Sequence, residues 1–312
     1  MQTTSPTLDK TIRIGTRASQ LAMWQAEWVA AALARHGHSV ELVQIATRGD
    51  ISTASLSQVG GQGLFTKEIQ RELLSGQVDL AVHSLKDLPT IPIEGLLLAA
   101  VPKRETTDDC LISRSGATFE QLSAGAKIGT GSARRGAQLL AWRPDIEISD
   151  IRGNVDSRMR KLAEGQYDAI ILAAAGLTRL NLASRVTEVL SPARMLPAIG
   201  QGALGLECRQ EDATTRAAVA ALNDPHSLAA VTAERSLLFH LLAGCLAPVA
   251  GLGRVKADGS LELSGAVFSL DGKQGVRGTV SGDIQQAASL GEQLALQLVE
   301  QGAGELIAAA RR

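Results

Sequence analysis

Residues 78–89, VDLAVHSLKDLP, join a short apolar run to a group of polar and charged side chains. The apolar residues at the start of the stretch are typical of a buried strand. The polar residues begin at His83 and include Lys86 and Asp87, and Pro89 stops further regular structure. Open α/β sheets bind their ligands at the carboxyl ends of their strands. This stretch therefore predicts a strand that ends in a functional site.

Two blocks of the chain resemble each other. The segment IGTRAS at residues 14–19 is similar to IGTGSA at 128–133, and VDLAV at 78–82 is similar to YDAII at 167–171. Each block has a strand, a Gly-Thr turn, a helix, and later a buried strand with an aspartate near its start. We therefore expect two similar α/β lobes that face a cleft.

Hydrophobic periodicity and turn residues predict the remaining elements of both blocks. Strands are expected at residues 11–15, 40–46, 127–129, 146–150, 168–173 and 203–208, with a shorter one inside 92–104. Helices are expected from the N-cap Ser19 to Gly37, from Phe65 to Gly76, and at residues 132–142 and 155–163. The glycine-rich run at 47–63 is expected to be a long functional loop.

The pattern changes after Pro225. A helix is expected at residues 229–242, strands at 249–255, 261–270 and 275–280, and a closing helix at 284–300. Asp-Gly pairs at 258–259 and 271–272 are typical of hairpin turns between such strands. This part of the chain predicts a compact α+β domain with antiparallel strands.

The composition excludes several classes of function. The chain has 312 residues, is 45% hydrophobic and has a formal net charge of −1, which argues against a general nucleic-acid surface. Any anion site must therefore be local. The chain has no signal-peptide pattern at its start and no apolar run near the roughly 20 residues that span a bilayer. Three widely spaced cysteines predict a reducing, cytoplasmic compartment.

Arginines recur shortly after the predicted strands. Guanidinium groups bind carboxylates in a planar, two-pronged way, so a set of them at strand ends predicts a ligand with several carboxylates or phosphates. Taken singly, each arginine is more often a solvated surface residue. The set consists of Arg17, Arg134, Arg135, Arg152, Arg158 and Arg179.

The pair Lys86-Asp87 admits two interpretations. A carboxylate in a basic cleft stays ionised and can stabilise a developing cation or move protons. The alternative is a surface ion pair of little consequence. His83 is either a base or a structural histidine at the end of a strand.

Cys245 stands in the segment AGCLAP, where small neighbours would leave a thiol accessible. A lone cysteine is more often a small buried hydrophobe, and Cys110 and Cys208 fit that alternative inside apolar strands. No Cys/His spacing predicts a zinc site, and there is no phosphate-loop or dinucleotide glycine motif.

Together these motifs resemble the porphobilinogen deaminase family, also called the hydroxymethylbilane synthases. The similarity extends over residues 11–307. It is carried by RIGTRAS (13–19), TRGD (47–50), GLF (63–65), HSLKDLP (83–89), GTGSARR (129–135), RGN (152–154), LPAIGQG (196–202) and GC (244–245).

The resemblance implies two doubly wound lobes like those of periplasmic binding proteins, plus a small α+β C-terminal domain. The expected first lobe is 1–102 with 203–220, the second is 108–196, and the C-terminal domain is 225–312. The family deaminates four porphobilinogen molecules and joins them head to tail on a dipyrromethane cofactor, releasing hydroxymethylbilane for haem biosynthesis. The resemblance implies that this cofactor is linked to Cys245.

The resemblance also implies a role for individual residues. Asp87 is the expected catalytic carboxylate, and the loop at 47–63 is the expected lid. Residues expected to bind the cofactor are Ser84, Lys86, Thr130, Ser132, Arg134, Arg135, Arg152 and Gln201. Residues expected to bind the substrate are Arg17, Ser19, Phe65, Arg158 and Arg179, and no metal is expected.

Some positions depart from the family pattern. Gln58 and Gln62 replace lysines that are usual in the lid, and Ala243 and Leu246 replace a glycine and a polar residue around the cysteine. Gly131 stands where serine is common.

The main alternative is a two-lobed binding protein for an anionic carboxylate metabolite, and a third is a regulatory sensor domain. The third domain bearing a cysteine and the missing signal peptide argue against the first. We expect a cytoplasmic monomer that acts on a small molecule, with no nucleic-acid or membrane partner.

Overall fold

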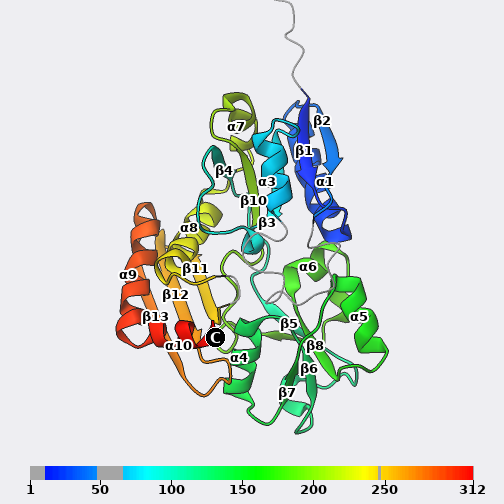
Figure 1. Ribbon diagram of the computed structural model, residues 1–312, viewed down its shortest axis with the longest axis vertical. Helices are drawn as coiled ribbons and strands as arrows, with labels where there is room; N and C mark the ends of the chain where they lie inside the picture. Colours follow the sequence, from blue (N-terminus) through cyan, green and yellow to red (C-terminus); the bar gives the residue numbers. More distant parts are fainter. Residues whose placement is uncertain (1–10, 48–65, 245–246, 312) are drawn as a thin grey trace, which may run out of the picture.

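The protein is described by a computed structural model that covers residues 11–47, 66–244 and 247–311. Within these residues the chain forms two five-stranded sheets and one three-stranded sheet, each with its own helices (Figure 1). We call the units built on the five-stranded sheets the first and second lobes, and the unit built on the three-stranded sheet the C-terminal domain.

The first lobe has the strand order β2-β1-β3-β10-β4. Its strands are β1 (Ile12–Thr16), β2 (Val40–Gln44), β3 (Leu80–Ser84), β4 (Leu96–Ala100) and β10 (Leu204–Arg209). Its helices are α1 (Gln20–Arg35), α3 (Lys67–Leu74) and α7 (Ala213–Ala220). β10 runs antiparallel to both neighbours, while β1 runs parallel to β2 and β3.

The second lobe has the order β7-β6-β8-β5-β9. Its strands are β5 (Asp109–Ser113), β6 (Lys127–Gly129), β7 (Glu147–Ser149), β8 (Ala169–Ala173) and β9 (Glu188–Leu190). Its helices are α4 (Ala133–Trp142), α5 (Val155–Ala163) and α6 (Ala174–Arg179). Here β5 is the antiparallel strand, so the two lobes have the same arrangement of directions.

The internal repeat of the sequence is a repeat of pairing register. Ile14 pairs with Leu80 in the first lobe, and Ile128 pairs with Ala169 in the second. The aspartate before each paired strand has the same role. Asp79 accepts a hydrogen bond from the Arg13 backbone at 3.1 Å, and Asp168 accepts one from the Lys127 backbone at 2.9 Å. The expectation of two similar α/β lobes is therefore confirmed.

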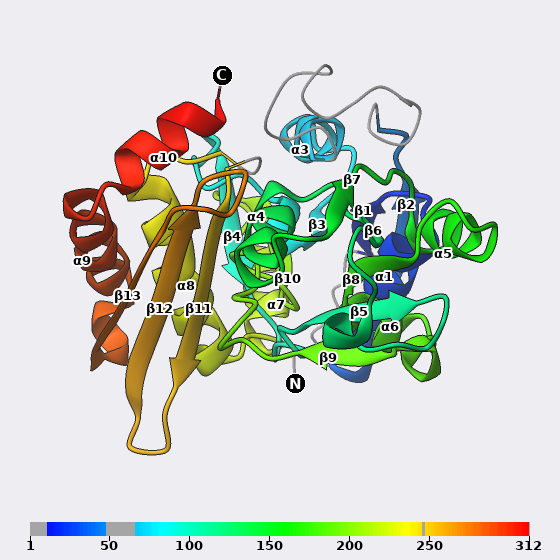
Figure 2. The same ribbon diagram turned by 90° about the horizontal axis from the view of Figure 1, so that it is seen from below.

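The C-terminal domain is an antiparallel sheet covered by helices (Figure 2). Its strands are β11 (Val249–Val255), β12 (Ser260–Phe268) and β13 (Gly275–Asp283), and its helices are α8 (Pro225–His240), α9 (Ala287–Glu300) and α10 (Ala303–Ala310). Leu237 of α8 and Leu294 of α9 lie in one apolar core with Leu263 of β12. Burial of such a face, rather than propensity, stabilises short helices of this kind.

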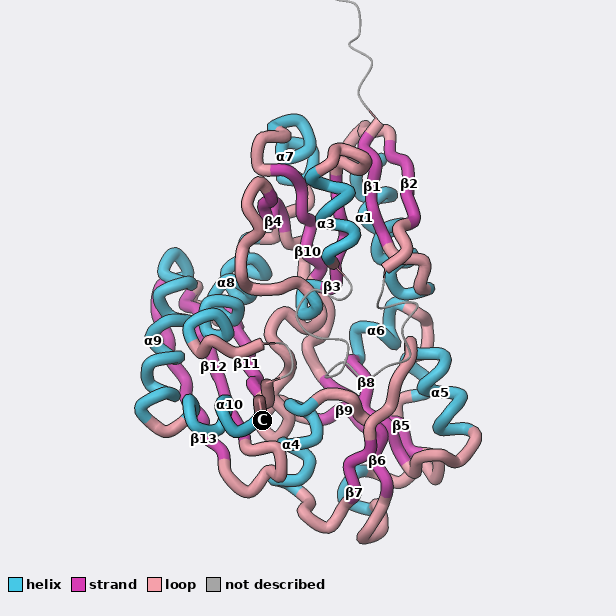
Figure 3. Tube along the Cα trace, in the orientation of Figure 1, coloured by secondary structure: helices cyan, strands magenta, loops and turns pink. Residues whose placement is uncertain are grey.

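Two extended segments cross between the lobes, and both are loops (Figure 3). They are residues 101–108 and residues 191–203, and we call the second the return segment. They run side by side, because the backbone N–H of Glu105 donates to the Gly202 carbonyl at 3.2 Å. Gly202 has φ 83°, and a Cβ there would lie 2.5 Å from the Thr106 carbonyl oxygen. Only glycine fits this close approach without strain.

The structure corrects some element boundaries. The strand predicted from Val78 begins at Leu80, and the helix predicted from Ala229 begins earlier, at Pro225, after the N-cap Asp224. Proline is well suited to the first helical turn, where its missing N–H costs nothing. The helices α6, α7 and α10 and the strand β9 were not predicted, and the apolar strand expected around Cys110 is β5. In the described part of the chain no helix combines the length and the apolar character needed to cross a membrane.

The hairpin turn between β12 and β13 packs against α4 of the second lobe. Gly272 has φ 71°, and a Cβ there would lie 2.5 Å from the Ala141 backbone nitrogen. Gly259, in the turn between β11 and β12, has φ 82° and nothing within 4 Å of its Cβ position. The two glycines therefore share their backbone conformation and differ in their surroundings.

We predict that Gly272→Ala destabilises the protein more than Gly259→Ala. The positive φ costs both variants about 1–2 kcal/mol, and overpacking against α4 adds roughly 1–3 kcal/mol to Gly272→Ala alone. Urea unfolding measures the difference. Equal losses in the two variants would contradict the close packing of this hairpin on the second lobe.

Candidate active site

The turn that follows β3 carries Lys86 and Asp87 on a short 3-10 helix, Leu85–Asp87. Leu85 and Leu88 are buried on either side of the pair and lie in one apolar cluster with Val101. The Leu85 N–H donates to the Ala203 carbonyl at 3.0 Å. Apolar anchors thus fix the backbone of the turn, while the side chains of Lys86 and Asp87 are half-buried.

Two other segments hold the same turn. A Cβ at Gly200 would lie 3.2 Å from the Lys86 backbone nitrogen, so the return segment is in close contact with it. From α8 of the C-terminal domain, Arg235 donates to the carbonyls of Leu88 and Pro89 at 2.9 and 2.7 Å. The turn is therefore positioned by the first lobe, by the return segment and by the C-terminal domain.

Asp109, at the start of β5, is the centre of a buried charge cluster. Arg134 and Arg135 of α4 each place an Nη2 nitrogen 2.7 Å from one of its carboxylate oxygens. The Gln201 amide donates to it at 2.9 Å. Burial acts to raise the pKa of Asp109, but the charges of the two arginines outweigh it and hold the pKa well below its usual range.

Both arginines of the cluster also bind backbone carbonyls. Arg134 donates to Leu196 at 2.6 Å, and Arg135 donates to Ile171 at 3.1 Å. Both arginines therefore lie at the carboxyl end of β8. The sequence had predicted that they would lie at the end of a strand. Their partners show that they are neither solvated nor free to move.

Arg179, in the last turn of α6, contacts both the return segment and the first lobe. It donates to the Gly202 carbonyl at 2.7 Å, and its guanidinium carbon lies 5.8 Å from the centre of the Trp24 ring of α1. Helices α6 and α1 lie next to each other in the region where the lobes meet (Figure 1). Burial lowers the pKa of Arg179.

Arg152 and Arg158 lie at the start of α5. Arg152 donates to Asp150 at 2.9 Å, and Arg158 donates to the Gly153 carbonyl at 2.8 Å. Burial, followed by the charges of Arg135 and Arg152, lowers the pKa of Arg158 to about 10, while Asp150 and Asp87 oppose the shift. Asp87 belongs to the first lobe, so its charge acts on an arginine of the second.

Lys86 lies in the same field. Burial, followed by the charge of Arg135, lowers its pKa to about 8, and Asp87 and Asp109 oppose the shift. Lys86 is therefore a cation that can lose its charge near neutral pH. The residues predicted from two separate lobes thus form one electrostatic unit with an excess of positive charge.

The predicted hydroxyl residues have local partners. Ser19 and Ser132 are the N-caps of α1 and α4, where their side-chain oxygens accept from backbone N–H groups. Thr130 accepts from the Ser132 N–H at 3.2 Å, and Ser84 accepts from the Gln25 amide at 2.9 Å. The Ser84 hydroxyl donates to the Gln25 side-chain oxygen at 3.2 Å, whereas the hydroxyls of Ser19, Thr130 and Ser132 can donate to a carboxylate as well as accept.

Depressions on the described surface include two with different linings. One, of about 280 Å³, is lined by Thr130, Gly131 and Ser132 with Asp150 and Leu270. It adjoins the predicted binding residues at the start of α4. A Cβ at Gly131 would lie 2.9 Å from an Asp150 side-chain oxygen and 3.2 Å from the Ile151 carbonyl oxygen.

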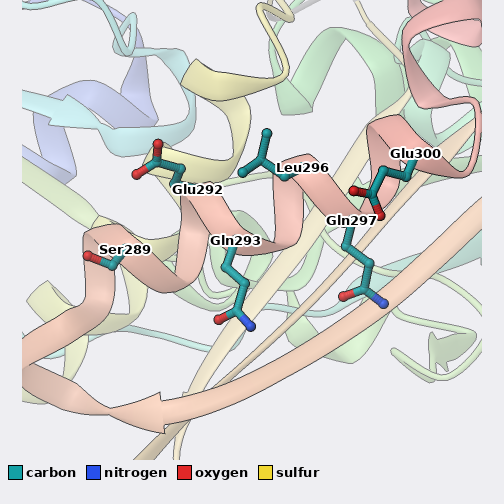
Figure 4. Close-up of a pocket in the computed structure, with 6 residues that line it drawn as sticks. All are labelled: Ser289, Glu292, Gln293, Leu296, Gln297 and Glu300. Carbon is teal, nitrogen blue, oxygen red and sulfur yellow. The ribbon is translucent and has the colours of Figure 1, made fainter.

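The other depression lies on the exposed face of α9 (Figure 4). It is lined by Ser289, Glu292, Gln293, Leu296, Gln297 and Glu300. Two carboxylates and no basic side chain do not suit a ligand that carries carboxylates.

Several predicted residues lie outside the described part of the chain. They are Cys245, Leu246, Phe65, Gln58 and Gln62, together with the loop at 48–63. Ala243, two residues before the cysteine, is described and is buried.

The prediction from sequence missed Asp109 and Arg235. Asp109 is the first residue of a strand instead of following one, and its partners come from segments that are distant in sequence. The alternative of a structural role for His83 is supported, because its ring lies 3.1 Å from the buried Glu207 carboxylate, to which the Gln70 amide also donates. A cluster of three or more potential metal ligands is not found among the described residues.

The described residues fit a ligand that carries several carboxylates. The Nε atom of Arg134 and the Oε1 atom of Gln201 are buried and have no hydrogen-bond partner in the described chain. Buried polar atoms without a partner are rare and call for an explanation such as a missing ligand. Arg134 therefore retains a donor that a carboxylate can use, beside the hydroxyls of Thr130 and Ser132.

The fold and the site define a two-lobed α/β protein with a basic site and a single turn that carries Asp87. Residues 12–217 match the family model "Porphobilinogen deaminase, dipyromethane cofactor binding domain", and residues 228–300 match that family's C-terminal domain. The chain belongs to the porphobilinogen deaminase family, whose members are transferases of porphyrin and haem biosynthesis that use a dipyrromethane cofactor.

Curated relatives are similar over nearly the whole chain. The porphobilinogen deaminase of Geobacter metallireducens is 50% identical over 302 residues, which are 96% of this chain and 94% of that protein. That of Geobacter sulfurreducens is 51% identical and covers 95% and 94%. That of Trichlorobacter lovleyi is 53% identical and covers 94% of each.

Solved structures show a more distant likeness. A periplasmic substrate-binding protein of an ABC transporter from Coxiella burnetii is 18% identical, covers 72% of this chain and 97% of that chain, and has a TM-score of 0.42. This likeness is too distant to bear on function.

We predict that kcat/KM for porphobilinogen falls as pH rises through about 8, because Lys86, with a pKa of about 8, is charged below this pH and neutral above it. In Lys86→Arg the cation persists at all these pH values, so the fall should be absent even if the overall rate is lower. A pH profile of both proteins measures this. The same descending limb in both would show that Lys86 is not the titrating group.

Proposed function

We propose that Asp87 is the catalytic carboxylate of this transferase and that Cys245 carries its dipyrromethane. In this proposal the chain deaminates four porphobilinogen molecules, joins them head to tail, and releases hydroxymethylbilane. The single observation that carries the proposal is the Leu85–Asp87 turn, which holds Asp87 next to Lys86 and is fixed by its buried leucines and by Arg235 of the C-terminal domain. A negative group is thus held within a basic site.

Asp87 has a role in both halves of each coupling. The C–N bond of the aminomethyl group breaks, ammonia leaves with the bonding electrons, and positive charge develops on the substrate pyrrole. A carboxylate that is already fixed stabilises this charge without reorganisation. The burial of Leu85 and Leu88 supplies that fixed position.

The second half of the coupling forms a C–C bond between the substrate methylene carbon and a free pyrrole carbon. When bound, dipyrromethane supplies that carbon for the first substrate molecule. The proton that this carbon loses passes to Asp87 and from there to solvent. Each round therefore consumes one porphobilinogen and releases one ammonia, and the carboxylate returns to its starting state.

The acidic side chains of cofactor and substrate are assigned to the basic and hydroxyl groups of the site. For the cofactor these are Ser84, Lys86, Thr130, Ser132, Arg134, Arg135, Arg152 and Gln201. For the substrate they are Arg17, Ser19, Arg158 and Arg179, with Phe65 near the incoming ring. A charge-assisted hydrogen bond contributes about 1.5–3 kcal/mol, so a few of them suffice for micromolar binding. The buried and unpartnered Nε of Arg134 supports this assignment.

The proposal extends to the organisation of the whole chain. We assign residues 1–102 with 203–220 to the first lobe, 108–196 to the second and 225–312 to the C-terminal domain. The membership of the three sheets supports this division. We also propose that the protein is a cytoplasmic monomer without nucleic-acid or membrane partners, for which a net charge of −1 is the supporting observation.

We predict that Asp87→Asn retains the fold and lowers kcat by a factor on the order of 10²–10⁴, the usual contribution of a positioned acid or base. The control is Asp258→Asn, which changes an exposed aspartate in the turn between β11 and β12. Ammonia release and thermal unfolding of both variants are measured. Turnover of Asp87→Asn at the rate of the control would rule out the assigned role.

A further inference from the structure

Asp109 is a buried carboxylate that the mechanism above does not use. Its side chain is fully buried and is bound by two arginines of α4 and by Gln201 of the return segment. These contacts bring the second lobe and the return segment to one carboxylate. A group with this many charged partners controls where the partners point.

The fold itself does not require a carboxylate at this position. Asp109 pairs with Ala173 in the second lobe, and Leu204 pairs with Ser84 in the first. Because Ile128 pairs with Ala169 and Ile14 pairs with Leu80, residues 173 and 84 occupy equivalent places four residues further along their strands. Leu204 is thus the counterpart of Asp109. The lobe with the buried arginine pair has an aspartate where the other lobe has a leucine.

A second buried aspartate shows what a purely structural group of this kind looks like. Asp79, 1% exposed, accepts from Arg13 at 2.9 Å and from Arg209 at 3.0 Å. It lies before the amino end of β3, at the opposite end of that strand from the Lys86 turn. Asp79 and Asp109 therefore have the same chemistry, two arginines on one buried carboxylate, but Asp79 belongs to the first lobe and Asp109 to the second.

The partners of Asp109 differ from those of Asp79 in one respect. Arg134 keeps a buried nitrogen without a partner, and Gln201 keeps a buried oxygen without one. The two arginines and Lys86 give the cluster an excess of positive charge over the single carboxylate. The pairing with Asp109 thus leaves the Nε of Arg134 without a partner, whereas Nε, Nη1 and Nη2 of Arg135 are all bound.

We propose that Asp109 is a positioning residue that sets the direction of the Arg134 and Arg135 guanidinium groups and thereby the affinity of the site for acidic pyrrole side chains. The inference rests on the proposed function for the identity of those side chains. Asp109 touches no substrate in this account. It acts through the arginines, which it holds in place and whose mutual repulsion it reduces.

The first test is independent of catalysis. Purified wild-type protein, Asp109→Asn and the control Asp79→Asn are treated with phenylglyoxal, which modifies accessible guanidinium groups, and the modified peptides are quantified by mass spectrometry. We expect Arg134 and Arg135 to react several-fold faster in Asp109→Asn, and at the wild-type rate in Asp79→Asn. Equal rates for these two arginines in all three proteins would overturn the inference.

The second test separates positioning from general destabilisation. Both aspartate variants are expected to lower the unfolding temperature, since each leaves arginines without a counter-charge. Only Asp109→Asn is expected to lower, at least several-fold, the share of purified protein that carries the dipyrrole adduct by intact mass, because Arg134 and Arg135 are assigned to the cofactor. If Asp79→Asn lowers this share to the same extent, the effect is one of stability and the inference fails.

A combined variant tests whether Asp109 acts through the two arginines. If it does, adding Asp109→Asn to Arg134→Met/Arg135→Met should lower the share of protein that carries the dipyrrole adduct by less than twofold beyond Arg134→Met/Arg135→Met alone. Independent, multiplying effects would overturn the inference. Failure of the proposed function would give a different result, because wild-type protein would then neither carry a pyrrole adduct nor release ammonia. The phenylglyoxal rates would still decide the role of Asp109.

Discussion

The structure depends on one balance of charge: a chain with a net charge of −1 gathers arginines and a lysine from two lobes around very few carboxylates. Buried cations of like sign repel, and burial alone disfavours each of them. Asp109 pairs with both buried arginines, while Asp87 only partly opposes the lowering of the pKa of Lys86 and, after Asp150, of Arg158. What is left is a local positive excess, which suits a ligand that gains carboxylates as it grows.

The two lobes have the same topology and divide the chemistry between them. In the first lobe, β3 ends in the turn that holds the carboxylate, and in the second the equivalent β8 ends at α6 beside the arginines of α4. The C-terminal domain is more than an attachment, because Arg235 binds the carbonyls that follow the Asp87 turn. The helix that provides Arg235 also leads towards Cys245, so anchoring and chemistry belong to connected parts of the chain.

Local pattern was sufficient for much of the fold and for part of the site. The bounds of β6, α5 and β11 agree with the sequence, since turn residues and periodicity delimit them. The repeat predicted two similar lobes, and its two copies have the same pairing register in the structure. Asp109 could not be predicted, because its importance arises from antiparallel pairing of β5 and from Gln201, 92 residues away. The partners of the arginines were likewise a property of tertiary structure, and α7 is too rich in alanine to show a periodic face.

The most direct test of the account is the mass of the intact protein at successive times after mixing with a limiting amount of porphobilinogen. The account predicts a resting mass that already includes a covalent dipyrrole, followed by a ladder of heavier species, each one pyrrole unit apart and at most four units above the resting mass. Cys245→Ser should show neither the resting adduct nor the ladder. A single unchanging mass that matches the bare sequence, with porphobilinogen recovered intact, would contradict the account.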